Sequence, residues 1–184
     1  MRLSDETYEY IKKTVADMFV FYDVKGIPIN SFEVAIKIGL TIVPYSALRD
    51  EDRELAFNYS RDGFSIENNN GGWIIYYNDV GKNYHRINQT IMHEVAHYIL
   101  GHVEEGEIEE AEAKFFAKYA LASPPLIHSM QGEKTISNIM EYCDIGYQAA
   151  RIALEYYIKR LCYGSKEYMD YEVKILRQLE LEAS

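Results

Sequence analysis

The sequence predicts an α+β fold that is mostly helical and carries a small antiparallel sheet. Apolar residues recur at helical spacing through several long segments. Two short runs of β-branched and aromatic residues flank an Asn- and Gly-rich loop, which is typical of a hairpin. A chain of 184 residues is long enough to bury about 70% of its unfolded surface, so it does not depend on disulfides for a core.

The N-terminal region is predicted to form a long helix, a short helix and a strand, over residues 6–24, 32–38 and 40–43. Gly26 and Gly39 follow the two helices as stop signals, and Pro44 ends the strand. Ser31 is the predicted N-cap of the short helix. Residues 46–60 are charged and show no clear period, so we predict no element there.

A hairpin and a helix are predicted in the middle of the chain. The hairpin joins strands 63–67 and 73–78 through residues 68–72, whose Asn and Gly side chains tolerate the positive φ of tight turns. The helix covers 87–100, where apolar residues recur at helical spacing, and Gly101 is its predicted C-cap.

The C-terminal part is predicted to be entirely helical. An acidic stretch over 104–112 leads into a helix that Pro124 and Pro125 end. Three further helices are predicted, over 137–142, 147–161 and 168–181. We expect residues 1–125 to form the functional domain and residues 126–184 a helical extension packed on the same core.

Charge and composition exclude several classes of protein. With 19 Lys and Arg against 29 Asp and Glu, the formal net charge is −10, which disfavours direct binding to nucleic acid. No apolar run reaches the length of a membrane span, and the N-terminal residues do not have the order of a secretory signal. Two cysteines are too few for a disulfide framework. We therefore expect a soluble, cytoplasmic protein.

The residues that point to chemistry are His93-Glu94-Val95-Ala96-His97. At about 100° per residue, His93 and His97 lie about 40° apart and one turn apart on one helix face. Two imidazole nitrogens in this arrangement can reach one zinc ion at about 2.0–2.1 Å. Glu94 lies beside them and is predicted to act as the general base without binding the metal.

A tetrahedral zinc site needs a third protein ligand. The longer pattern HExxHxxGxxH is absent because Leu100 and Val103 stand where it requires Gly and His. The ligand must therefore come from a separate element. Glu110 shares the small-apolar face of the following helix, which favours it. Glu112, at the edge of that face, and Glu109, nearer to Phe116 and Ala120, remain alternatives.

Three segments together resemble the ImmA/IrrE metallo-endopeptidases of bacteria and their mobile elements. They are residues 73–78, residues 86–102, and residues 110–117 followed by Pro124, and the resemblance covers roughly residues 27–125. It implies a zincin-like core in which His93, His97 and Glu110 bind zinc and Glu94 is catalytic. Lys114 stands where the family usually has Asn or Asp, so we do not expect a hydrogen bond from this position to a zinc histidine.

The resemblance also implies a function: a zinc endopeptidase that cleaves a helix-turn-helix repressor of a mobile element or stress regulon. Tyr98, His102 and Tyr76 are the candidate contacts to the substrate or the transition state. His85 and His128 are also conceivable, but we interpret them as surface histidines. Strand 73–78 would offer an extended substrate a sheet edge beside the active site, unless this strand belongs to the core.

Two other functions compete with proteolysis. A catalytically silent, metal-binding regulator that titrates a repressor would carry the same histidines and glutamates. Residues 135–161 have the spacing of a helix-turn-helix, but their outer face is not basic, so we interpret them as a packed helical pair. Iron or manganese could also occupy a His/His/Glu site in place of zinc.

Overall fold

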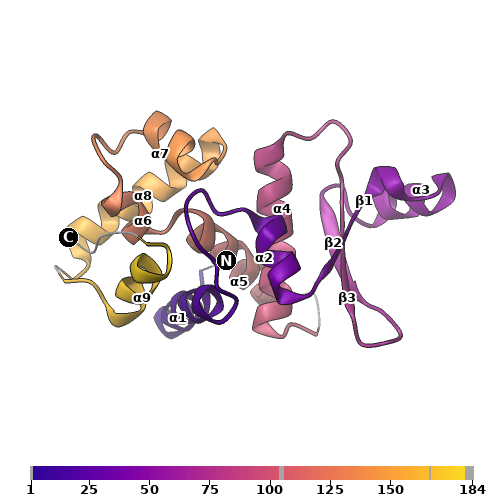
Figure 1. The fold of residues 1–184 in the computed structure, drawn as a ribbon, viewed down its shortest axis with the longest axis horizontal. Coiled ribbons are helices and arrows are strands. Elements are labelled where there is room, and N and C mark those ends of the chain that lie inside the picture. The colour runs from indigo at the N-terminus through magenta and orange to yellow at the C-terminus, as the bar shows by residue number, and fades with distance from the viewer. Residues whose placement is uncertain (1, 104–105, 166, 181–184) are drawn as a thin grey trace.

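The computed structural model describes residues 2–103, 106–165 and 167–180 and has an α+β, mostly helical architecture, as the sequence predicts. Figure 1 shows a small sheet at one side of the molecule and the C-terminal helices at the other. The strands are β1 (Thr41–Pro44), β2 (Gly63–Glu67) and β3 (Trp73–Tyr77). The helices are α1 (Asp5–Phe21), α2 (Ser31–Ile38), α3 (Asp50–Tyr59), α4 (Tyr84–Leu100), α5 (Glu107–Ala122), α6 (Pro124–Ser129), α7 (Ile136–Cys143), α8 (Tyr147–Tyr163) and α9 (Asp170–Gln178), with a short 3-10 turn at Tyr45–Ala47.

The sheet is mixed, which corrects the prediction of an antiparallel sheet. Its strand order is β1-β3-β2, with β2 antiparallel to β3 and β1 parallel to it. The hairpin is local and could be predicted, whereas β1 reaches β3 only after α3 and β2 intervene. Of the two alternatives for residues 73–78, the structure shows the core strand and not the sheet edge, because β3 is central and lies between β1 and β2.

One face of the sheet packs against α2 and α4. Ile75 of β3 is fully buried, the Trp73 ring lies 5.7 Å from that of Tyr98 on α4, and the Tyr77 ring lies 5.5 Å from that of Phe32 on α2. These alternate residues of β3 share one face, as expected for a strand. The sheet therefore rests on the helix that carries the HExxH motif (Figure 1).

The helices form one continuous hydrophobic core that spans the predicted boundary at residue 125. Fully buried Phe116 on one side of it and Leu126 and Ile175 on the other belong to the same cluster. α4 packs on α5, α1 packs on α5 and α9, and α8 packs on α5, α6 and α7. Lys174 of α9 donates to Asp17 of α1 at 2.7 Å. No helix within the described ranges is long and apolar enough to cross a bilayer.

Several element boundaries differ from the prediction for local reasons. α3 was not predicted because Ala56 is its only buried residue, so its sequence lacks an apolar period. The N-cap of α2 is Asn30, whose side chain accepts two backbone N–H groups, and Ser31 is the first, buried helical residue. Pro124 ends α5 but also begins α6, in keeping with the preference of proline for a first helical turn. Leu181, the predicted end of the last helix, lies outside the described residues.

Candidate metal centre

Helix α4 brings His93 and His97 together on one face. Its N-cap is Asn83, whose side chain accepts the N–H of Arg86, and its C-cap is Gly101, as predicted, in the left-handed conformation with φ 69°. The Nε2 atoms of His93 and His97 lie 3.2 Å apart. Both side chains are largely buried, with exposed fractions of 20% and 11%.

Glu110, in the first turn of α5, completes the group. Its Oε1 atom lies 3.4 Å from Nε2 of His93 and 3.4 Å from Nε2 of His97. Ala113 and Ala117 continue the same face of α5 and are buried, so the two helices approach closely. This convergence is the one predicted from the helix face.

The spacing of the three donor atoms fits a tetrahedral metal site. Ligand atoms at about 2.0–2.1 Å from a tetrahedral zinc lie about 3.3–3.4 Å from one another. The observed separations of 3.2, 3.4 and 3.4 Å match one face of such a tetrahedron. Across the ranges that the structure describes, this is the one group of His, Cys, Asp and Glu side chains that converges in this way.

The pKa values of the three side chains are shifted towards the protonation states that bind a cation. Burial, together with the nearby imidazoles of His93 and His102, lowers the pKa of His97 to about 4, and burial also lowers the pKa of His93. Both imidazoles are therefore neutral at pH 7 and offer lone pairs. Burial opposes the ionisation of Glu110, but the hydrogen bond from Lys114 at 2.7 Å and the adjacent histidines lower its pKa. Two neutral nitrogens and one carboxylate are a donor set that suits zinc.

Glu94 lies beside these ligands without joining them. Its side chain is 7% exposed, and the hydroxyl of Ser65 on the edge strand β2 donates to its Oε2 atom at 2.9 Å. The carboxylate of the predicted general base is therefore connected to the sheet as well as to its own helix.

The centre opens into a cleft of about 560 Å³ between β2, α4 and α5. The three candidate ligands and Glu94 line it, together with residues of the surrounding elements: Tyr59 of α3, Gly63 and Phe64 of β2, Thr90 of α4 and Lys114 of α5. An edge strand along a cleft leaves backbone N–H and C=O groups unpaired by the sheet. The cleft is thus lined in part by a strand that can pair with a further strand.

The three predicted substrate contacts lie outside the residues that line this cleft. Tyr98 packs on Trp73, and Tyr76 stacks on Phe64 with ring centroids 5.2 Å apart. His102 contacts the Nδ1 atom of His97, on the side of the ring remote from the other ligands. The two histidines interpreted as surface residues form their own contacts: His85 pairs with Asp144, and His128 is hydrogen-bonded to Tyr157.

Of the two alternative third ligands, Glu112 contacts His102 instead, with Oε2 at 3.0 Å from its Nε2 atom. Glu109 is not part of the converging group. In the structure the three glutamates thus have different neighbours, although they are close in sequence.

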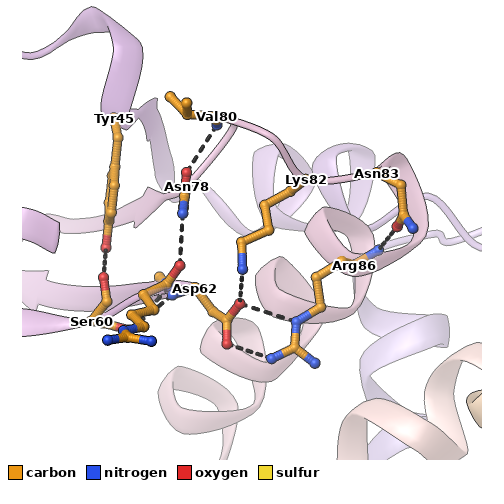
Figure 2. Close-up of polar contacts among 10 residues, drawn as sticks. Tyr45, Ser60, Asp62, Asn78, Val80, Lys82, Asn83 and Arg86 are labelled. Atoms are coloured by element: carbon orange, nitrogen blue, oxygen red, sulfur yellow. Dashed lines mark hydrogen bonds and ion pairs between the residues drawn. The ribbon is translucent and has the colours of Figure 1, made fainter.

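A polar cluster that was not predicted from the sequence includes Asp62 and Arg86, which line the cleft (Figure 2). The Asp62 carboxylate accepts from Nε and Nη2 of Arg86 on α4 and from Nζ of Lys82 at 3.1 Å. The backbone N–H of Asn78 donates to the carbonyl oxygen of Asp62 at 2.8 Å, and the hydroxyl of Tyr45 donates to that of Ser60 at 3.1 Å. These bonds fix the segment that leads into β2.

Gly63, the first residue of β2, lies against α4. A Cβ atom at this position would lie 2.7 Å from Cγ2 of Thr90 and 2.8 Å from the carbonyl oxygen of Tyr76. Only glycine allows this approach without a shift. Together with the Asp62–Arg86 and Ser65–Glu94 contacts, it docks the edge strand on α4 at three points.

Comparison with known proteins adds no identification. No protein-family model matches the chain, and no curated protein is significantly similar to it. The resemblance to the ImmA/IrrE endopeptidases therefore stays a prediction that rests on the motifs quoted above.

Proposed function

We propose that this chain is a zinc-dependent endopeptidase with a zincin-like active site. His93, His97 and Glu110 hold the metal, and Glu94 is the general base. The observation that carries the proposal is the convergence of the three donor atoms at tetrahedral spacing, with a buried carboxylate beside them and an open cleft in front. The ordered motifs of the ImmA/IrrE resemblance support the same assignment.

In this mechanism the metal, when bound, supplies Lewis-acid polarisation of the peptide carbonyl and makes water a stronger nucleophile. Glu94 accepts the proton of the attacking water and then donates it to the leaving amine. The Ser65 hydroxyl holds Oε2 of that carboxylate. Because β2 is an edge strand, a peptide lying along it would be held by main-chain hydrogen bonds.

The proposed substrate is a protein, a helix-turn-helix repressor of a mobile element or stress regulon, and the proposed setting is the cytoplasm. The family resemblance carries this part of the proposal. Release of transcription would follow from cleavage of the repressor, without direct contact between this acidic chain and nucleic acid.

The first test is metal content, measured by elemental analysis on protein purified without added metal or chelator. We expect about one zinc per chain in the wild type, according to the three-ligand site. Glu110→Ala should lose the metal, whereas the matched control Glu109→Ala, in the same helical turn, should keep it. Absence of zinc from the wild type even after zinc is offered would overturn the proposal.

The second test separates catalysis from stoichiometric binding. Wild-type protein and Glu94→Gln are incubated with a proteome-derived peptide library, and new N-termini are identified by mass spectrometry. We expect cleavage by the wild type alone, with equal zinc content in both proteins, because Glu94 moves protons but does not bind the metal. A zinc-loaded wild type that yields no new N-termini would favour the silent metal-binding regulator.

A further inference from the structure

The chain turns back on itself directly after the helix that carries the two histidines. Gly101 adopts the left-handed conformation with φ 69°, and the backbone N–H of His102 donates to the carbonyl oxygen of His97 at 3.0 Å. This turn brings the His102 ring against that of His97, with their Nδ1 atoms 2.9 Å apart. The other ring nitrogen of His102 lies 3.0 Å from Oε2 of Glu112 on α5.

The three side chains form a hydrogen-bonded chain that is largely shielded from water. The exposed fractions of the His102 and Glu112 side chains are 8% and 22%. An ionised carboxylate only accepts hydrogen bonds, so Nε2 of His102 must be the donor to Glu112. When the His102 imidazole is neutral, its hydrogen lies on Nε2 and its lone pair lies on Nδ1, so this Nδ1 atom accepts from His97.

With His102 in this neutral form, the order of donors sets the tautomer of His97. Its hydrogen lies on Nδ1, where it is donated to His102, and its lone pair lies on Nε2. The Nε2 atom is the one that lies 3.2 Å from Nε2 of His93 and 3.4 Å from Oε1 of Glu110. The contacts behind His97 therefore select the tautomer that can bind a metal.

We propose that His102 and Glu112 are positioning residues of the metal centre, which orient His97 and hold it in its metal-binding tautomer. This inference rests on the proposed function. It assigns Glu112 to the outer side of the centre, in place of the ligand role considered from sequence. Lys114 contacts Glu110 and not a histidine. The side chain that orients His97 is instead His102, which contacts the Nδ1 atom of His97.

The test is the zinc dissociation constant, measured by competition with a chromophoric chelator. His102→Phe keeps an aromatic ring but cannot accept from His97, and we expect zinc binding to weaken by about 10–100-fold, the usual effect of losing such a partner. His102→Asn places an oxygen near the former Nδ1 and should restore most of the affinity. His85→Phe is the matched control, since His85 lies on the same helix and pairs with Asp144 away from the centre.

A second variant and a second readout keep the inference testable if His102→Phe does not fold. Glu112→Leu should weaken zinc binding by about tenfold, because His102 then loses the acceptor that fixes its own tautomer. The absorption spectrum of the cobalt(II)-loaded protein, which reports ligand geometry, should change in this variant and remain unchanged in His85→Phe.

The outcomes separate the two proposals. A wild type that binds no zinc overturns the proposed function. A wild type that binds zinc, with folded His102→Phe and Glu112→Leu variants that bind it equally tightly, overturns the positioning role and leaves the endopeptidase proposal intact.

Discussion

The hydrogen bond from Ser65 to Glu94 gives the proposed general base a partner outside its own helix. We expect Ser65→Ala to lower kcat by about tenfold or more with little change in KM, because a hydrogen bond to a charged group contributes about 1.5–3 kcal/mol. The measurement uses the peptide that the library experiment finds to be cleaved most readily. Ser65→Thr keeps the hydroxyl and should retain most of the rate. A rise in KM alone, or equal losses in both variants, would contradict this role.

Contacts between side chains could be predicted from the sequence where the helical period decides which face of a helix a residue occupies. His93 and His97 share a face because they are four residues apart, and Glu110 could be chosen because the small residues of its helix mark the packed face. Ser65 could not be predicted, since 29 residues separate it from Glu94. The contact of His102 with His97 depends on the direction in which the chain leaves Gly101, which a helical period does not describe.

The edge strand is docked on α4 without space for an added methyl group. Gly63→Ala should destabilise the protein by about 1–3 kcal/mol, as overpacking does, because its Cβ would meet Thr90 and the Tyr76 carbonyl oxygen. The check is the free energy of urea unfolding. Adding Thr90→Ser removes the methyl group of the first clash and should recover part of the loss, while the backbone clash remains. A double variant as stable as the wild type would show that the backbone contact does not constrain the strand.

The Asp62–Arg86 pair ties the same strand to α4 and makes its docking sensitive to acid. Hydrogen bonds from Arg86 act against burial and, with Lys82, lower the pKa of Asp62 from 3.8 to about 2. The stabilisation is therefore complete above pH 3.8 and is lost as the pH falls towards 2.

Asp62→Asn should accordingly be less stable than the wild type by about 1 kcal/mol at pH 7, a value typical of a partly exposed pair. The difference should shrink as urea unfolding is repeated at lower pH values below 4. Asp17→Asn, which breaks a more exposed pair with Lys174, is the control and should change stability little at any pH. A difference for Asp62→Asn that stays constant down to pH 2 would contradict the assigned pKa.

Among the elements, those that could be predicted from sequence have an apolar period of their own. The hairpin followed from its Asn- and Gly-rich loop, and α4 followed from its buried stripe. α3 has one buried residue, Ala56, and the parallel direction of β1 depends on the path of the chain through α3 and β2. These features are decided by tertiary packing, which local periodicity does not record.

If the centre binds zinc as proposed, the metal should stabilise the whole molecule. At a free zinc concentration about 100 times the dissociation constant, binding to the folded state alone adds about 2.7 kcal/mol. For a chain of this size that corresponds to a rise in Tm of about 5–11 °C. Differential scanning fluorimetry with zinc and then with excess chelator measures it, and His97→Gln should show no shift. An equal shift in that variant would place the zinc elsewhere.

The packing of α1 against α9 has a consequence for how the chain folds during its synthesis. Gln178 of α9 donates to Asp23 at 3.1 Å, directly beyond the end of α1. α1 can dock on α5 once residue 122 has left the ribosome, but its second partner emerges only with residue 178. A nascent chain arrested between these points would therefore expose the apolar surface of α1 that α9 later covers, and this surface would be open to chaperones.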